Sequence, residues 1–250
     1  MRLQNKKLHE LKSLPVLVAT AIAGCGNPNA VDSETLGTQG LWVGVRFEAP
    51  GNGATGINVE LNEGGRSGND VRLSANERLE VNANGMIVVL VEDEDFLDID
   101  YEGSVMTDAS DTLLTLSLYR ADGSINDRTR VNLPALFTIT SPADNQAVTV
   151  GEVIEVQWSP AGVGTIALGV TTQCSGHTRA DFLDLPDNGS YTISTAALPG
   201  IQDPAIPREN GCTLTVDLTR KRQGVLDPAF RGGGFVSAIQ MRSVQLPLSF

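Results

Sequence analysis

Apolar and polar residues alternate along short stretches of this chain, with the period of two that is typical of β-strands. Ile154, Val156 and Trp158 share one face of such a stretch, and Glu155 and Gln157 share the other. The same alternation, bounded by Asn, Asp, Gly and Pro, marks further candidate strands at 41–47, 57–61, 114–118, 166–174, 190–194 and 212–218. Long stretches rich in Ala, Leu, Glu and Lys, which helices favour, are absent from the sequence. The pattern predicts an all-β protein of the sandwich type.

One apolar run departs from this alternation. Residues 86–91 read Met-Ile-Val-Val-Leu-Val, with no polar position among them. A continuous apolar run of this length is typical of a strand that is buried on both faces. We therefore expect this segment to lie in the interior of a sandwich.

Two short motifs occur once in each half of the chain, in the same order. Residues 114–120 (LTLSLYR) match residues 214–220 (LTVDLTR), and residues 131–137 (VNLPALF) match residues 244–250 (VQLPLSF). The repeated order favours a tandem duplication. It predicts a first β-sandwich domain at 40–137 and a second at 138–250, each of ordinary domain size.

The second half also carries a family pattern. Residues 137–142 read FTITSP, Gly151 and Glu152 follow, and residues 154–159 read IEVQWS; further on, residues 187–191 read DNGSY. This pattern resembles the opening of immunoglobulin-like and fibronectin-like bacterial domains, and of the Ig-like domain in fungal cell-wall assembly proteins. The resemblance implies an Ig-like β-sandwich. It departs from antibody domains, in which the Trp follows the first Cys, because Trp158 precedes both cysteines of this half.

The N-terminus has the composition of an export signal. Four basic residues precede an apolar run at 14–24, and small residues close that run. A basic start, a short apolar core and a small-residue end are typical of a secretory signal peptide. The run is shorter than the roughly 20 apolar residues that a membrane-spanning helix needs.

The end of this signal has a motif of its own. Ile22-Ala23-Gly24-Cys25 resembles the lipobox of bacterial lipoproteins. The resemblance implies cleavage of residues 1–24, fatty acylation of Cys25 (palmitate among the acyl chains) and stable attachment to a membrane. Gly26, standing where an Asp would signal retention at the inner membrane, implies the bacterial outer membrane, facing the periplasm or the cell surface. An ordinary signal peptide with a chance Cys is the alternative. The whole chain also resembles uncharacterised exported bacterial lipoproteins, which implies no activity.

The residues after the lipidation motif are polar and rich in turn formers. Residues 25–39 show no apolar periodicity. A segment that buries so little apolar surface does not offset the entropy lost on ordering. We expect the lipidated Cys25 to be followed by a flexible tether up to residue 39.

Two further cysteines remain, Cys174 and Cys212. Each is in phase with the apolar face of its candidate strand, and an exported chain folds under oxidising conditions. The pattern predicts a buried Cys174–Cys212 disulfide, with a stabilisation of about 4 kcal/mol in the chain-entropy model. Metal binding is the alternative, but two isolated cysteines make a poor zinc site.

Charge and the scarcity of histidine restrict the function. The chain has a net charge of −12, and loss of a basic leader would make it more acidic. That balance argues against nucleic acid as a partner and against electrostatic docking on anionic lipid. His177, near Ser175, is the one histidine after residue 24, and no nucleophile elbow, P-loop or dinucleotide motif occurs. We expect a protein that is not an enzyme and has no cofactor.

One acidic stretch is a weak candidate for calcium binding. Asp95, Asp98, Asp100 and Glu102 lie in it, and the spacing of the last three mimics the start of an EF-hand loop. The mimicry fails at Ala109, where a bidentate Glu is required. A solvated acidic turn is the alternative to a calcium site.

These features together favour one functional class. We expect a lipid-anchored envelope protein that acts as a non-catalytic binding or structural module, with an envelope protein or glycan as partner. One alternative is a carbohydrate-binding or carbohydrate-active protein, which an exposed aromatic stripe or facing carboxylates would favour. A second alternative is a calcium-stabilised adhesion module.

Overall fold

A computed structural model describes residues 30–94, 98–203 and 212–250. The predicted signal peptide, Cys25 and Asp95 lie outside the described residues. The described chain is all-β, as the alternation predicts. Its helical elements are single turns: η1 (Ser33–Thr35), η2 (Thr38–Gly40), η3 (Thr195–Ala197) and α1 (Pro199–Gln202). No helix within the described ranges has the length and apolar character needed to cross a membrane.

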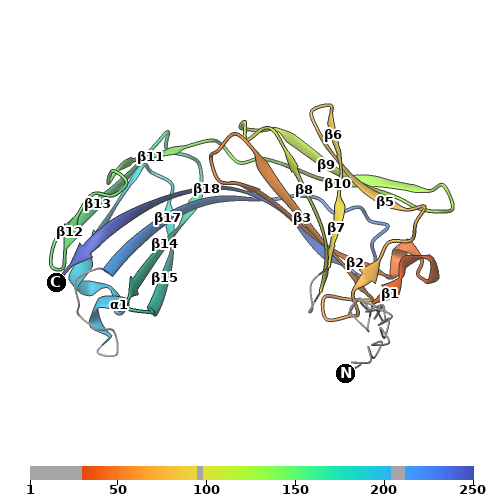
Figure 1. The fold of residues 1–250 in the computed structure, drawn as a ribbon. Helices are drawn as coiled ribbons and strands as arrows, with labels where there is room; N and C mark the ends of the chain where they lie inside the picture. Colours follow the sequence, from red (N-terminus) through yellow and green to blue (C-terminus); the bar gives the residue numbers. More distant parts are fainter. Residues whose placement is uncertain (1–29, 95–97, 204–211) are drawn as a thin grey trace, which may run out of the picture.

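One large sheet runs the length of the molecule (Figure 1). Its strands follow the order β15-β14-β17-β18-β2-β3-β8-β7, and β12 also pairs with β18. Their bounds are β2 (Leu41–Ala49), β3 (Thr55–Glu63), β7 (Val91–Glu94), β8 (Ile99–Val105), β12 (Val148–Thr149), β14 (Thr165–Cys174), β15 (His177–Pro186), β17 (Cys212–Gln223) and β18 (Gly234–Ser249).

Two smaller sheets cover one face of the large sheet. The first has the order β10-β9-β5-β6, and the second has the order β11-β13-β16. A short parallel pair, β1 with β4, lies beside β3 of the large sheet. The bounds are β1 (Val31–Asp32), β4 (Val71–Arg72), β5 (Arg78–Ala83), β6 (Met86–Val89), β9 (Leu113–Tyr119), β10 (Ile125–Asn132), β11 (Thr138–Ser141), β13 (Val153–Ser159) and β16 (Ser190–Ser194). Figure 1 shows an arch, with the large sheet as its inner layer and the small sheets outside.

Two hydrophobic cores fill the space between the layers. The first joins β2, β3 and β8 to the sheet of β5 and β9, and its largest fully buried side chains include Phe47, Leu79 and Leu116. The second joins β14, β17 and β18 to the sheet of β13, and it contains Trp158 and Ile166. Each core is a sandwich of two sheets, in which inward-facing residues of both layers interdigitate.

The hairpin of β17 and β18 belongs to both cores. Val236 and Ala238 near the start of β18 lie in the first core, whereas Leu246 and Leu248 near its end lie in the second. The start of β18 pairs in parallel with β2, at residues 234–240 against 43–49, and β17 pairs along nearly all of β18. The sheet is thus continuous across residue 137, and the division into domains at 40–137 and 138–250 stays a prediction about folding units.

The repeated motifs occupy equivalent hairpins in different layers. Residues 114–120 and 131–137 fall on β9, β10 and the segment after them, in the outer layer. Residues 214–220 and 244–250 fall on β17 and β18, in the inner layer. The similarity between the repeated motifs therefore reflects a shared local hairpin structure. The sheet that each hairpin joins depends on the rest of the chain.

The apolar run at 86–91 is not buried on both faces, so that prediction is wrong. The chain passes here from β6, at the edge of one sheet, to β7, at the edge of the other. Ile87, Val89 and Val91 are more than half exposed, whereas Leu90 at the crossing point is buried in the first core and Val88 packs against that core partly buried. Apolar composition alone does not distinguish an edge strand from a central one.

The predicted tether also differs from the structure over its described part. From Val31 onward the chain forms β1, η1 and η2. Ser33 is fully buried and hydrogen-bonds Glu77, while Arg120 donates to the carbonyl oxygens of Ser33 and Leu36. Buried polar groups anchor this segment, so its low apolar content does not prevent its ordering.

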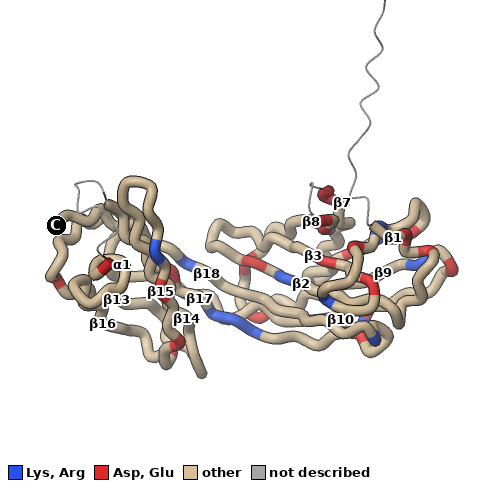
Figure 2. The backbone as a smooth tube through the Cα atoms, turned by 90° about the horizontal axis from the view of Figure 1, so that it is seen from below, with Lys and Arg blue, Asp and Glu red and all other residues tan. Residues whose placement is uncertain are grey.

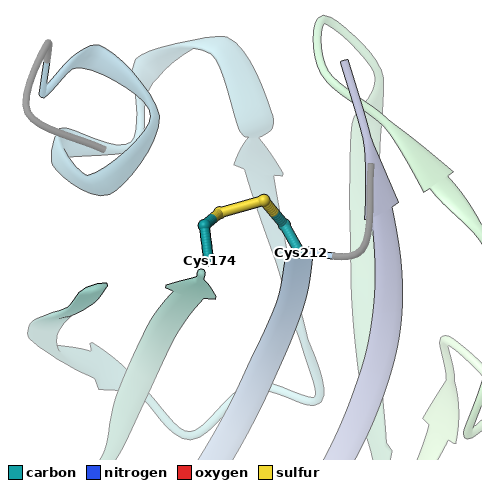
Figure 3. Close-up of a disulfide and its surroundings, with 2 residues drawn as sticks. All are labelled: Cys174 and Cys212. Atoms are coloured by element: carbon teal, nitrogen blue, oxygen red, sulfur yellow. A yellow bond between two sulfur atoms is a disulfide. The ribbon is translucent and has the colours of Figure 1, made fainter. Parts of the chain in front are cut away.

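The predicted disulfide is confirmed (Figure 3). Cys174 ends β14 and Cys212 begins β17, and both side chains point into the second core, as their phase predicts. The bond fastens two neighbouring strands of the large sheet at the end of their ladder.

A buried ion pair lies at the point where the hairpin passes between the cores. The Arg220 guanidinium on β17 binds both carboxylate oxygens of Asp187, at 2.6 and 2.9 Å. It also donates to the carbonyl oxygens of Ala135 and Pro160, at 3.1 and 2.6 Å, and lies 4.6 Å from the centre of the Phe137 ring. Arg220 therefore ties the peptide that crosses between the sandwiches to the β17–β18 hairpin.

Asp187 is held in its charged form by this environment. Burial by itself raises the pKa of a carboxyl group, but hydrogen bonds from Arg220, from the Trp158 indole and from Gly162 N–H outweigh it, so the pKa of Asp187 lies below its ordinary value. At pH values above the ordinary pKa of an Asp, the charged form of Asp187 stabilises the fold in full. This stabilisation is lost as the pH falls through the lowered pKa of Asp187.

We predict that Arg220→Ala lowers the free energy of unfolding by about 3–5 kcal/mol, because it leaves the Asp187 charge buried without its partner. The matched control is Arg222→Ala, two residues along the same strand, whose ion pair with Asp111 is exposed. That control is expected to cost less than about 1 kcal/mol. Urea denaturation followed by circular dichroism measures both.

The same experiment has a pH arm. Asp187→Asn is expected to be less stable than the natural protein at pH 7, with a difference that shrinks on acidification through the range in which Asp187 titrates. Equal losses for Arg220→Ala and Arg222→Ala, or a difference independent of pH, would contradict the account.

Candidate binding face

The inner face of the arch is the side of the large sheet that neither small sheet covers, and we call it the concave face (Figure 1). On β17 and β18 the even-numbered side chains enter the cores, so the odd-numbered ones point to the concave face. Register then assigns to this face the side chains of Thr213, Thr215, Asp217, Thr219, Lys221, Gln223, Phe235, Ser237, Ile239, Trp42, Arg46, Glu48, Asn58, Glu60, Asp100 and Glu102. The face is mainly polar, with a few aromatic side chains.

A groove of about 470 Å³, which we call the central groove, lies where β2, β18 and β17 run side by side. Its side chains are Arg46 and Glu48 from β2, Lys221 from β17, Phe235 from β18, and Arg66 from the segment after β3, together with Thr219, Gln223, Ser237 and Ile239. Its volume lies within the range of small-molecule sites.

The aromatic ring of Phe235 lines this groove, and the buried Trp42 packs against it. Phe235 and Trp42 meet edge to face, with ring centres 5.8 Å apart. Gly44 follows Trp42 by two residues on β2 and is paired with Phe235 on β18. A β-carbon built on Gly44 would lie 2.8 Å from the Trp42 ring. The absence of a side chain at Gly44 therefore lets the Trp42 ring lie flat on the sheet and support Phe235.

Arg46 connects the aromatic pair to the acidic side of the face. Its guanidinium pairs with Glu60 on β3 and lies 5.0 Å from the centre of the Phe235 ring. A cation at this distance from an aromatic ring is attracted by the ring quadrupole. Arg46 is thus held over the groove by two neighbours.

Acidic and amide side chains gather beyond Arg46, on β3 and β8. Asn58 donates to Asp100 at 2.9 Å, and burial together with Glu60 and Glu102 raises the pKa of Asp100 despite that hydrogen bond. One oxygen of Asn58 and one of Asp100 are buried with no hydrogen-bond partner among the described residues. Buried acceptors of this kind indicate a place for a donor from solvent or ligand. Figure 2 shows Lys and Arg along β17, β18 and β2, and a group of Asp and Glu at β7 and β8.

The described calcium candidates lie on β8 or directly before it. Asp100 and Glu102 are alternate residues of β8 and face the same side, while Asp98 precedes that strand. Within the described ranges, no three or more His, Cys, Asp or Glu side chains are arranged to hold a metal ion. Because Asp95 lies outside those ranges, calcium binding stays a prediction.

Ser175 and His177 belong to a tight turn. Ser175 and Gly176 both have positive φ and connect β14 to β15, as the two central residues of a hairpin turn do. His177 begins the edge strand opposite Cys174 and is exposed. The Ser-Gly-His sequence therefore forms the turn between β14 and β15 and the start of β15.

Sequence reasoning did not identify the groove. Arg46 occupies a polar position of the strand at 41–47, and Arg66 follows the strand that pairs with it, but Lys221 comes from a segment far away in sequence. Lys221 meets the two arginines because β18 pairs with β2, a parallel contact between residues about 190 positions apart. No local pattern encodes that contact.

Comparison with known proteins identifies no family. No family model matches the chain, and no curated protein matches it. Similar solved structures include a cytokine receptor complex (13% identity over 78% of this chain and 97% of that one, TM-score 0.30). They also include fibronectin(III)-like modules of CbhA from Clostridium thermocellum (14% identity, 83% and 90% coverage, TM-score 0.22) and a bacterial ice-binding adhesin (12% identity, 84% and 65% coverage, TM-score 0.23). At these values the similarity carries no argument about function.

We predict that Gly44→Ala shifts the Trp42 ring and weakens the packing of Phe235, because the added methyl group would overlap the indole. Near-ultraviolet circular dichroism and tryptophan fluorescence measure the change. The control is Gly56→Ala on β3, also on the concave face, where a β-carbon meets its nearest neighbour at an ordinary 3.7 Å. An unchanged aromatic spectrum for Gly44→Ala would refute this packing.

Proposed function

We propose that this chain is a lipid-anchored protein of the bacterial cell envelope, attached through Cys25, and that it acts as a non-catalytic binding module. The concave face of the large sheet is its binding surface. The observation that carries the proposal is that none of the elements within the described residues covers one polar face of the nine-stranded sheet, while two small sheets cover the opposite face.

The exposed aromatic side chains on this face support a role in binding. Phe182 on β15 is 76% exposed and rests against Gly169, so its ring lies on the sheet surface. Phe235 lies on β18, in the middle of the strand order, partly buried in the central groove. Aromatic rings in a polar surface supply contact area at a low cost in side-chain entropy, and they are enriched in binding sites.

A glycan partner is favoured over a protein partner by the rest of the face. Hydroxyl and amide side chains predominate along β17 and β18, and large aliphatic side chains are few. Protein interfaces have an apolar centre with charged groups at the rim. The concave face has the reverse arrangement, with charged groups in its central groove. The calcium-stabilised alternative has no corresponding observation in its support.

We predict that Thr215→Arg, in the middle of the concave face, weakens binding of the purified protein to washed envelopes of the producing bacterium at least about tenfold, since a long charged side chain obstructs the surface. Both this variant and its control are made in the Cys25→Ser background, so that the proposed lipid anchor does not contribute to sedimentation. The matched control is Thr115→Arg, at the corresponding position of the repeated motif on the outer face of β9, with the same gain of charge and volume. Sedimentation with labelled protein gives the affinities.

The anchor is measured in the same cells. The natural protein is expected to fractionate with membranes, and Cys25→Ser to be released from them. Equal binding by Thr215→Arg and Thr115→Arg would contradict a concave binding face, and membrane attachment of Cys25→Ser would contradict the lipid anchor.

A further inference from the structure

We infer that the central groove binds an acidic oligosaccharide, with the sugar acid lying between Arg46, Arg66 and Lys221. The inference rests on the proposed function and names the ligand class for part of its surface. Its first support is charge: the groove is lined by these three cations and by one carboxylate, Glu48, in a chain whose net charge is −12. The groove thus has the opposite sign to the protein as a whole.

Two of the three cations have no counter-ion within the described part of the chain. Arg46 pairs with Glu60, but among the residues that the structure describes neither Arg66 nor Lys221 takes part in an ion pair, although acidic residues outnumber basic ones by 30 to 18 in the sequence. Like charges that line one groove repel each other unless an anion or solvent screens them. A bound carboxylate or sulfate would remove that repulsion and accept charge-assisted hydrogen bonds from both side chains.

The rest of the groove is suited to a sugar ring. Phe235 offers an aromatic surface, on which the apolar C–H face of a sugar packs. The side chains of Thr219, Gln223 and Ser237 offer donors and acceptors for sugar hydroxyls. A small phosphate or sulfate ion would need only the cations and would leave these groups and most of the 470 Å³ unused.

The test uses the purified full-length protein in mild detergent and isothermal titration calorimetry with tetragalacturonate, which has a carboxylate on every ring. The matched probe is the same tetrasaccharide with its carboxylates reduced to hydroxymethyl groups. A sulfated chondroitin tetrasaccharide distinguishes sulfate from carboxylate as the acidic group. We expect at least one acidic tetrasaccharide to bind, and the neutral one to bind at least about tenfold more weakly.

The variants are Lys221→Gln and Arg66→Gln, with Arg179→Gln on the exposed edge strand β15 as the control for loss of one positive charge outside the groove. Each groove variant is expected to weaken acidic binding about five- to tenfold, and the control to leave it unchanged. Absence of binding by both acidic probes, equal binding of the neutral one, or equal effects of all three variants would overturn the inference. If envelope binding is still lost in Thr215→Arg under any of those outcomes, the proposed function stands and only the ligand class fails.

Discussion

The β17–β18 hairpin takes part in two hydrophobic cores at once, and the rest of the structure depends on this constraint. A strand of 16 residues spans about 50 Å, more than one sandwich needs, so the start of β18 lies in the first core and its end in the second. Arg220 is buried midway along this hairpin, bound to Asp187 and to the carbonyls of the crossing peptide. Removing it would leave a buried carboxylate and free carbonyl groups at the point where the two sandwiches meet.

This shared hairpin also makes the concave face. Two sandwiches joined only by a linker would each present a separate surface, and their relative orientation would vary. Here the hydrogen-bonded ladder passes without interruption from β15 to β7, so side chains from both halves hold fixed positions on one surface. The shared hairpin also forms the central groove, because β18 pairs with β17 on one side and with β2 on the other and so brings Lys221 close to Arg46. The cationic groove and the acidic strands β7 and β8 then divide the face into regions of opposite charge.

The local part of the fold could be predicted from the sequence, and the non-local part could not. Alternation located β2, β3, β9, β13, β14, β16 and β17, because a strand with one buried face must alternate. The phase of Cys174 and Cys212 predicted their pairing for the same reason. Alternation contains no information about which strands become neighbours, so neither the parallel pairing of β18 with β2 nor the groove was predictable. The apolar run at 86–91 was expected in the interior, but it lies at the edges of two sheets. The polar segment at 31–40 was expected to be flexible, but buried hydrogen bonds to Arg120 and Glu77 order it.

The most direct test of a single continuous sheet is the distance between the two sandwiches in solution. Non-cysteine spin labels can be placed at Asn82 on β5 and at Glu155 on β13, two exposed positions in the outer layers of the first and second sandwich. Pulsed electron–electron double resonance then reports the distribution of distances between them. One narrow distribution is the result that a hairpin shared by both cores predicts. A broad or multimodal distribution, as two bodies on a flexible linker would give, would contradict it.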